Sequence, residues 1–530
     1  MVRTRFAPSP TGYLHIGGLR TALYCYLFAR KNKGNFLLRI EDTDQERFVE
    51  GAVENLIKTL SWIGIEYDEG PLLDGSEKGK FGPYTQSKRT ELYTKHADEL
   101  IEKGHAYRCF CTKEHLEEMR SAQENAKLPP MYDRTCAKLP KSEIEEKLKA
   151  KIPFVVRQKM PYELIKFKDL VRGNVQFDGK TIDDQVLIKS DGFPTYHLAN
   201  VVDDHLMKIS HVIRGEEWLP STPKHIALYN AFGWEHPEFA HVPLLLNEDK
   251  SKLSKRQGDV SVESYIEKGY LKEAIINFAA FLGWNPGSGE EKEIFTLEEL
   301  EKVFSIEHVH KAGAIFNIEK LDWFNWKWQK EIFNKKIFAL AKKIDAKVEI
   351  DLSRKDQPKF LFTSEDKEEK FKEEKGKYLL EICEKHLDKK YLSDKNILKM
   401  LVTVEEKILR DPKEISSQID FYFTLPNYPK ELLTNEKMGV DFSWAKKSLE
   451  NAQQDLEKLD DWKVSEIKNV LTKIVEKFSC KNGQVFWPLR AALSGLEFSP
   501  GVFEIAHTLG KKESLTRIEK ALKNLGIYTK

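Results

Sequence analysis

The segment His15-Ile16-Gly17-Gly18 combines an imidazole with two glycines near the start of the chain. Glycines let a ligand approach the backbone closely, and N–H groups at the start of a helix favour phosphate. An imidazole there can donate a hydrogen bond to negative charge that develops on a phosphate. Because a histidine in a turn is the commoner explanation of such a pattern, this segment alone predicts no function.

A second candidate is the basic segment Lys252-Leu253-Ser254-Lys255-Arg256, which Gln257-Gly258 follow. Two lysines three residues apart on a loop could hold the charge of a triphosphate, a role that suits a compact ammonium group. A basic surface loop is the simpler interpretation when this segment is taken by itself. The phosphate hypothesis therefore depends on the two segments occurring together.

Three of the six cysteines, Cys109, Cys111 and Cys136, are crowded into one part of the chain. Six cysteines in 530 residues do not indicate a disulfide framework. Thiolates are soft ligands that suit tetrahedral zinc. The sequence thus predicts a metal site here, with free thiols as the alternative, and ordinary buried thiols for the other three cysteines.

The elements that must position the first segment form a β-α-β pattern. Thr4 to Phe6 resembles a short strand, and the prolines of residues 7–12 prevent its continuation. Apolar residues then recur at helical spacing from Gly17 onward, and Gly34 is placed to end that helix. Asn35 to Ile40 is typical of a buried strand. Parallel sheets of this kind place their loops where α/β enzymes bind ligands.

Composition is that of a soluble globular protein of several domains, with 41% hydrophobic and 32% charged residues. The N-terminus has no apolar signal-peptide region, and no stretch of about 18 uncharged apolar residues occurs. We therefore expect a cytoplasmic protein. The net charge of +1 argues neither for nor against a polyanionic partner, because binding depends on local patches.

Beyond the first unit, residues 87–195 interrupt the α/β pattern with helical stretches, the cysteines and short strand-like runs. The sheet pattern returns between Gln185 and about Asn247, with a strand through HLMKISHVIRG followed by a helix through STPKHIALYNAFGW. After about residue 325 the chain becomes helical and lysine-rich. We interpret its charged run at 363–377 as a solvated helix face or a linker.

Taken together, FAPSPTGYLHIGG, RIEDTD at 39–44 and KLSKR resemble the class I aminoacyl-tRNA synthetases, and in detail their bacterial glutamyl branch. The resemblance covers nearly the whole chain, including residues 192–229 and GQVFWPLRAALSG at 483–495. The signature of the class usually ends in histidine, where this chain has Gly18, a departure that is common in glutamyl-type members. His15 must then act without a second signature histidine.

The resemblance implies a glutamate–tRNA ligase that uses ATP to make glutamyl-adenylate and transfers glutamate to the 2′-OH of the 3′-terminal ribose of tRNA-Glu. Whether tRNA-Gln is also charged stays open. Members of the glutamyl branch generally need bound tRNA before activation. Mg²⁺ is expected as a counter-charge to the phosphates, and the chain is expected to act as a monomer.

The resemblance also assigns residues to the two substrates. Arg5 and Arg214 are expected to hold substrate carboxylates through paired hydrogen bonds, and Glu41 to attract the α-ammonium group. Glutamine would leave a guanidinium unpaired and should be rejected. The expected glutamate-binding residues are Arg5, Ala7, Ser9, Glu41, Tyr196, Asn200 and Arg214. The expected ATP-binding residues are Thr11, His15, Gly17, Glu217, Trp218, Lys252 and Lys255, of which His15, Lys252 and Lys255 stabilise the phosphates during attack.

For the cysteines, the usual pattern of the family places a histidine two residues after the third cysteine, where this chain has Lys138. Tyr132 is four residues before Cys136 and could complete the site as a phenolate, as in some relatives. His105 and His115 are alternatives. The predicted ligands of a structural zinc ion are Cys109, Cys111, Tyr132 and Cys136.

The predicted fold class is α/β, with a Rossmann-type parallel-sheet catalytic domain that is split by an insertion and followed by an all-α anticodon-binding region. The expected boundaries are 1–86 and 196–246 for the catalytic halves, 87–195 for the insertion that binds the tRNA acceptor end, 247–325 for a stem-contact domain, and 326–430 and 431–530 for two anticodon-binding subdomains. Candidate tRNA contacts there are Trp323, Trp326, Lys327, Trp328 and Arg490.

Three alternatives remain. Glutaminyl-tRNA synthetases share the catalytic pattern but typically carry a β-barrel anticodon region, whereas residues 330–530 are expected to be helical. A tRNA-modifying enzyme of the glutamyl-queuosine type lacks the long C-terminal half. A catalytically inactive tRNA-binding protein should have lost His15, Arg5 or the two lysines of KLSKR, all of which are present.

Overall fold

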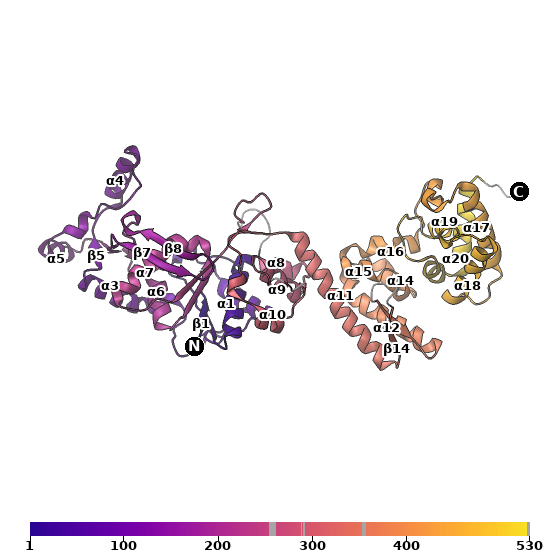
Figure 1. The fold of residues 1–530 in the computed structure, drawn as a ribbon, viewed down its shortest axis with the longest axis horizontal. Coiled ribbons are helices and arrows are strands. Elements are labelled where there is room, and N and C mark those ends of the chain that lie inside the picture. Colours follow the sequence, from indigo (N-terminus) through magenta and orange to yellow (C-terminus); the bar gives the residue numbers. More distant parts are fainter. Residues whose placement is uncertain (254–260, 288, 290–291, 352–356, 527–530) are drawn as a thin grey trace. The chain divides into compact units, whose positions relative to one another are not determined.

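The computed structural model describes residues 1–530 apart from 254–260, 288, 290–291, 352–356 and 527–530 (Figure 1). The chain divides into two compact units, Met1–Trp328 and Gln329–Lys530. The first unit is mixed α/β, and the second is mainly helical. Among the described residues, no helix is long and apolar enough to cross a bilayer.

The N-terminal β-α-β prediction is confirmed. Strand β1 (Arg3–Phe6) pairs in parallel with β2 (Asn35–Leu38), and α1 (Ile16–Lys31) connects them. The expected strand ends two residues earlier than predicted, at Leu38. Gly34 has a different role from the predicted helix cap, because a side chain there would overlap the carbonyl oxygen of Val2. Its small size lets the chain enter β2 beside the start of β1.

The second half of the sheet contains a helix that the sequence analysis missed. Residues 196–206 form α6 (Tyr196–Leu206), so the expected strand through HLMKISHVIRG is restricted to β10 (His211–Gly215). Helix α7 (Thr222–Phe232) follows as predicted, and β11 (Glu238–Val242) pairs in parallel with β10. The strand order in this sheet is β10-β11-β7-β8, where β7 (Leu164–Asp169) and β8 (Gly173–Asp178) form an antiparallel hairpin.

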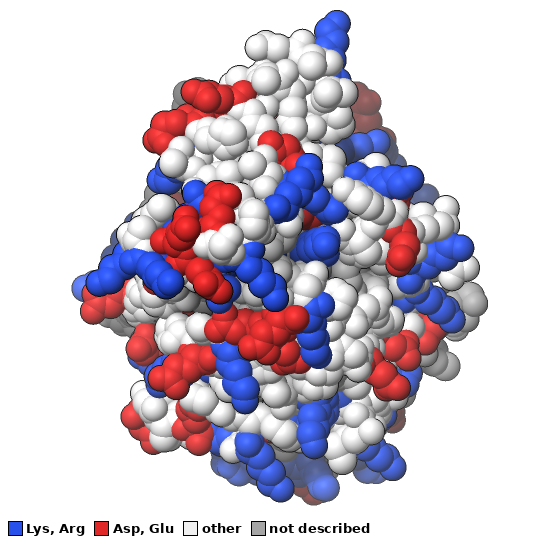
Figure 2. All heavy atoms as spheres, turned by 90° about the vertical axis from the view of Figure 1, so that its left-hand side faces the viewer, with Lys and Arg blue, Asp and Glu red and all other residues white. Residues whose placement is uncertain are grey.

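The remainder of the insertion is built on a small antiparallel sheet in the order β5-β6-β9. Helices α4 and α5 bury none of their residues, and basic and acidic side chains are interspersed over the face at this end of the unit (Figure 2). The elements of the insertion are α3 (Thr90–Glu102), β5 (Ala106–Cys109), α4 (Lys113–Asn125), α5 (Lys141–Lys149), β6 (Val155–Gln158) and β9 (Val186–Ile188).

The two largest buried apolar clusters among the described residues of the first unit join its parts. One joins α1 and β2 to the later helices of the unit, and the other joins the insertion to α6 and α7. Elements in the first cluster and around it are α2 (Ala52–Ile63), β3 (Gly70–Pro71), β4 (Glu77–Lys78), β12 (Leu245–Leu246), α8 (Val262–Glu267), α9 (Lys272–Phe281), α10 (Leu297–Val303) and β13 (Ala314–Ile315).

The second unit is helical as expected, with one added strand pair. Helix α11 (Ile318–Lys343) leads into the antiparallel strands β14 (Lys347–Asp351) and β15 (Gln357–Leu361), where Phe360 packs against Phe371. The charged run at 363–377 forms most of α12, which confirms the helical interpretation. The helices are α12 (Glu365–Cys383), α13 (Lys389–Leu392), α14 (Ile397–Thr403), α15 (Glu405–Arg410), α16 (Ile415–Phe423), α17 (Phe442–Glu457), α18 (Val464–Lys477), α19 (Asn482–Ser494) and α20 (Val502–Asn524).

Candidate active site

A cavity of about 1250 Å³ opens where β1, β2 and β10 end. Its walls come from the loop after β1, the start of α1, the segment after β2, the start of α6 and the segment after β10. Thirteen of the fourteen residues predicted to bind glutamate or ATP line this one cavity: Arg5, Ala7, Ser9, Thr11, His15, Gly17, Glu41, Tyr196, Asn200, Arg214, Glu217, Trp218 and Lys252. The fourteenth, Lys255, lies outside the described residues.

His15 is the residue that caps the start of α1. Its Nδ1 accepts a hydrogen bond from the backbone N–H of Gly17 at 2.9 Å. In the neutral ring the proton is therefore on Nε2, and His15 is one of the residues that line the cavity. Because the Gly17 N–H is already bonded, the imidazole is the better candidate for a phosphate contact at this end of the helix. A Cβ at Gly18 would lie 3.0 Å from Leu14 Cδ1, so a side chain there would need a small shift of the leucine.

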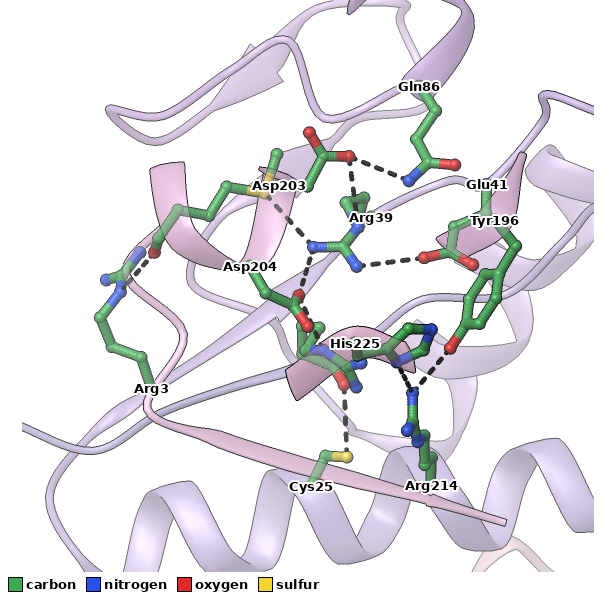
Figure 3. Close-up of polar contacts among 12 residues, drawn as sticks. Arg3, Cys25, Arg39, Glu41, Gln86, Tyr196, Asp203, Asp204, Arg214 and His225 are labelled. Atoms are coloured by element: carbon green, nitrogen blue, oxygen red, sulfur yellow. Dashed lines mark hydrogen bonds and ion pairs between the residues drawn. The ribbon is translucent and has the colours of Figure 1, made fainter. Parts of the chain in front are cut away.

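One group of charged side chains at the cavity is strongly ion-paired (Figure 3). The Oδ1 atom of Asp204 accepts hydrogen bonds from Arg5 Nε at 3.0 Å and from Arg39 Nη1 at 2.7 Å. Arg39 also donates to Glu41 Oε1 at 3.1 Å. With its amide turned, the Asn200 oxygen accepts from both guanidinium groups at 3.3 Å. This group fixes the directions of Arg5 and Glu41 before any substrate arrives.

The electrostatics of this group follow from burial and mutual pairing. Burial opposes ionisation of Asp204, but Arg5 and Arg39 outweigh it and lower the pKa of that carboxyl. Burial likewise opposes the charge of Arg39, yet the adjacent carboxylates raise its pKa well above the usual value. For Glu41 burial prevails and raises the pKa. The α-ammonium group of a bound glutamate would stabilise the ionised form of Glu41, which agrees with the predicted role of Glu41 in binding that group.

Asp203 forms an outer layer that anchors helix α6. Its carboxylate accepts hydrogen bonds from Arg89 Nε at 2.7 Å, Tyr93 OH at 2.8 Å and Gln86 Nε2 at 2.9 Å. Arg39 Nε lies 3.8 Å from the same carboxylate. The insertion is therefore tied to the helix that carries Tyr196 and Asn200.

Arg214 has a very different environment from Arg39. It donates from Nε to His241 Nε2 at 3.1 Å, from Nη2 to Thr222 Oγ1 at 2.9 Å and from Nη1 to Tyr196 OH at 3.0 Å. His225 Nδ1 lies 3.3 Å from Nη1. None of these partners is a carboxylate, and within the described part of the chain Arg214 forms no ion pair. The guanidinium is held in place while its charge stays uncompensated.

The tyrosine and tryptophan predicted to bind different substrates contact each other. The ring centroids of Tyr196 and Trp218 are 4.1 Å apart, and the Trp218 carbonyl accepts a hydrogen bond from Thr222 Oγ1 at 3.2 Å. The glutamate and ATP residues thus form one continuous wall. Adjacent binding of the two substrates is what a reaction between a carboxylate and a phosphate requires.

The three cysteines predicted to bind metal come together in the insertion. Their Sγ atoms all lie within 4.8 Å of one another, and the Cys111 and Cys136 sulfurs are 3.5 Å apart. Tyr132 OH is 3.2 Å from Cys111 Sγ. A zinc ion with bonds of about 2.3 Å to sulfur needs tetrahedral ligands separated by roughly 3.8 Å. The donor set and its spacing fit zinc, and neither His105 nor His115 belongs to this described cluster.

Several residues that build the cavity were not identified from the sequence as site residues. Arg39 stands in the quoted segment RIEDTD, and the adjacent acids Asp203 and Asp204 interrupt an apolar helical run, which is a signal for buried ion pairs. The partners of Arg214 give no local signal, because they lie on β7, α7 and β11. The direct partners among them are Thr222, His225 and His241, and Asp169 contacts His241.

One prediction about the tRNA contacts is corrected. Trp328 is only 4% exposed and belongs to the apolar core of the first unit, so it offers no stacking surface. Arg490 donates to the carbonyl oxygens of Glu497 and Ser499 and lies over the Trp487 ring. Trp328 is therefore a core residue of its helix and not a tRNA contact.

Comparison with known proteins gives the family. The catalytic domain of class I tRNA synthetases for E and Q matches residues 1–323, and an anticodon binding domain matches residues 371–522. A glutamate–tRNA ligase of Chlorobium chlorochromatii is 46% identical, with 98% of each chain covered. That of Clostridium tetani is 44% identical over 99% of this chain and 98% of the relative. The chain belongs to the glutamate–tRNA ligase family.

A solved glutamate–tRNA ligase from Elizabethkingia meningosepticum, in complex with its amino acid, has the same fold, with a TM-score of 0.76, 36% identity and 99% of each chain covered. The catalytic match spans every described residue of the cavity. Coverage of both units by glutamate–tRNA ligases decides against the glutaminyl and queuosine-type alternatives. The predicted fold class, an α/β catalytic region followed by a helical region, is confirmed.

Proposed function

We propose that this glutamate–tRNA ligase activates L-glutamate with ATP in the cavity at the ends of β1, β2 and β10, and then transfers it to tRNA-Glu. The observation that carries the proposal is the convergence of the substrate residues on one cavity, where Arg214 has no carboxylate partner among the residues that the structure describes. Two acids on the substrate need positive charge, and the reaction needs phosphate contacts beside them.

Charge balance favours glutamate over glutamine. The carboxylates Glu41, Asp203 and Asp204 pair with the guanidinium groups of Arg5, Arg39 and Arg89, whereas no carboxylate of the described residues contacts Arg214 directly. Glutamate brings one net negative charge and glutamine brings none. An amide in place of the side-chain carboxylate would leave a buried charge unpaired, which is the discrimination that binding sites achieve best.

In the first step the α-carboxylate of glutamate attacks the α-phosphorus of ATP, and pyrophosphate leaves. His15, from the segment HIGG, donates from Nε2 to the phosphates. Lys252, from the segment KLSKR, contributes an ammonium group to the same cavity. Thr11, Gly17, Glu217 and Trp218 hold the nucleotide. Lys255 is assigned the same role as Lys252, and Mg²⁺ supplies counter-charge.

In the second step the terminal ribose 2′-OH of tRNA attacks the acyl-adenylate and releases AMP. We assign binding of the acceptor end to the insertion and of the anticodon to the region matched as an anticodon binding domain. The interspersed charges on the face shown in Figure 2 favour contacts by local groups over a uniformly basic surface. Asp203 on α6 contacts Arg89 and Tyr93 of the insertion. These contacts connect the insertion, to which we assign the tRNA acceptor end, with the helix that carries Tyr196 and Asn200.

We also propose that Cys109, Cys111, Cys136 and Tyr132 hold a structural zinc ion. Such an ion would fix the segment between β5 and Cys136, and it takes no part in the reaction. Metal analysis of the purified protein should find about one zinc per chain, and Cys136→Ser should lose it. Retention of zinc by that variant would overturn the assignment.

Acid-precipitable label tests the proposed activity. The purified full chain is incubated with ATP, Mg²⁺ and unfractionated bacterial tRNA, together with labelled glutamate or labelled glutamine. Incorporation of glutamate alone supports the proposal, and purified tRNA-Gln then becomes the next substrate. Incorporation of glutamine would show that the enzyme has glutaminyl specificity and would contradict the proposal. Incorporation of neither amino acid would support a non-catalytic tRNA-binding role.

A further inference from the structure

A chain of buried hydrogen bonds leads from Asp169 to the guanidinium of Arg214. Asp169 Oδ2 lies 2.6 Å from His241 Nδ1, and His241 Nε2 lies 3.1 Å from Arg214 Nε. The side chains of Asp169 and His241 are fully buried. These residues come from the end of β7, from β11 and from β10, so only the sheet order brings them together.

The geometry fixes the proton on His241. Its Nδ1 faces a carboxylate and must carry the proton, so Nε2 is left as an acceptor for the Arg214 N–H. A protonated ring would set an N–H against the N–H of Arg214. Burial lowers the pKa of His241, although the Asp169 hydrogen bond opposes this, so the ring is neutral at physiological pH.

The other contacts of Arg214 are neutral acceptors as well. Thr222 Oγ1 accepts from Nη2, and Thr222 is itself within 3.1 Å of His241 Nε2. His225 presents Nδ1 to Arg214 and lies 3.0 Å from His197 Nδ1 through its Nε2. Burial and the neighbouring guanidinium lower the pKa of His225 well below its usual value. The whole environment therefore orients Arg214 without neutralising it.

We propose that Asp169 and His241 are positioning residues which set the orientation of Arg214 and, together with Thr222 and His225, reserve its positive charge for the side-chain carboxylate of the substrate. The inference rests on the proposed function and specifies how its discrimination arises. The α-carboxylate must reach phosphorus, so a guanidinium held firmly in the wall suits the side-chain carboxylate instead. Selectivity against glutamine then depends on the neutrality of the side chains in direct contact with Arg214.

The substitution Asp169→Asn tests the proton arrangement with little change in shape. Asp169 Oδ1 accepts three backbone N–H groups, from Val171, Arg172 and His241, at 2.9, 2.8 and 3.3 Å. These donors require the amide oxygen of asparagine on their side. Its NH₂ group must then face His241 Nδ1, which forces the ring proton onto Nε2 and sets two donors against each other at Arg214.

We expect Asp169→Asn to raise the KM for glutamate about tenfold, and to lower the ratio of kcat/KM for glutamate over glutamine by a similar factor, with the KM for ATP unchanged. His241→Gln can donate to Asp169 and accept from Arg214, so it should retain more selectivity than His241→Leu. Asp184→Asn is the matched control, because Asp184 is a buried carboxylate that accepts from Tyr107, Arg134 and a backbone N–H away from Arg214. It should leave the selectivity ratio unchanged.

The outcomes separate the inference from the proposed function. If Arg214→Gln leaves the glutamate KM unchanged, the assignment of Arg214 to substrate fails, and the inference fails with it. If Arg214→Gln raises that KM while folded Asp169→Asn and His241→Leu keep the wild-type selectivity ratio, the inference alone is overturned. If Asp169→Asn does not fold, the order of His241→Gln and His241→Leu in selectivity decides, and equal ratios contradict the inference.

Discussion

Arg39 and Arg214 are both buried arginines of the catalytic unit, yet they have opposite surroundings. Arg39 contacts Asp204 and Glu41 and lies near Asp203, so its charge is compensated within the protein. Arg214 is surrounded by a tyrosine, a threonine and two neutral histidines. The difference teaches that burial of a charge does not reveal its role. A paired guanidinium holds the fold, and an oriented but unpaired one is available to a ligand.

The largest expected effect is on stability, from Arg39→Met. The substitution leaves Asp204 and Glu41 buried with too little positive charge, which should reduce the free energy of unfolding by roughly 3–5 kcal/mol. Denaturant unfolding followed by circular dichroism measures this. Arg30→Met is the control, because the Arg30–Asp68 pair is partly exposed and should contribute only about 0–1 kcal/mol. Equal losses in the two variants would contradict the comparison.

Arg214→Gln should show the reverse behaviour. Stability should change little, because no carboxylate is left unpaired, whereas kcat/KM for glutamate should fall about 100-fold, or roughly 2.7 kcal/mol. Steady-state aminoacylation with glutamate and ATP varied separately measures the effect, with an unchanged KM for ATP expected. A fall in stability like that of Arg39→Met would show that Arg214 is a structural residue.

The two environments should also respond differently to acid. Burial lowers the pKa of His197 to about 4, below the value of about 6.5 in an unfolded chain. Between these values the unfolded state binds more protons, so stability falls as the pH drops from 6.5 towards 4. The lowered pKa of Asp204 acts in the same direction but in a lower pH window, since its contribution is fully present above the unfolded pKa of about 3.9 and is lost only as the pH falls towards its lowered folded value.

We therefore expect a loss of about 2 kcal/mol from His197 between pH 6.5 and pH 4.5, and a flatter profile for His197→Asn. Unfolding measured at a series of pH values tests this. His236→Asn serves as a histidine control outside the Arg214 environment. If His197→Asn reproduces the wild-type slope, the neutral histidines are not the acid-sensitive part of the unit.

The smallest expected effect comes from Thr222→Val, which removes one of the acceptors of Arg214 and retains the side-chain shape. The other acceptors remain, so the KM for glutamate should rise only about fivefold, or roughly 1 kcal/mol. Thr59→Val in α2 is the matched control, because Thr59 is equally buried and lies outside the cavity. A larger effect of Thr222→Val than of Arg214→Gln would contradict the assignment of Thr222 as a residue that acts through Arg214.

Much of the site could be predicted from the sequence because motif residues are adjacent in the chain. FAPSPTGYLHIGG specifies a strand end, a loop and a helix start in one segment, and these local elements place Arg5, Ser9 and His15 on one wall. Periodicity found α1 and α7. It missed α6, where Asp203 and Asp204 break the apolar pattern, and it missed β14 and β15 in a lysine-rich region.

Within the sequence, residue types and spacing indicated the α/β and helical regions and the clustered cysteines, and the motifs indicated the family, whose resemblance then assigned the residues that line the cavity. Those features depend on residue type and on spacing over short segments. Only the tertiary structure decided which charges are paired, that the predicted Tyr132 lies beside the cysteines, and that Trp328 is core. The physical reason is that pairing and burial depend on residues from distant segments, as when β7, β10 and β11 bring Asp169, Arg214 and His241 into one line.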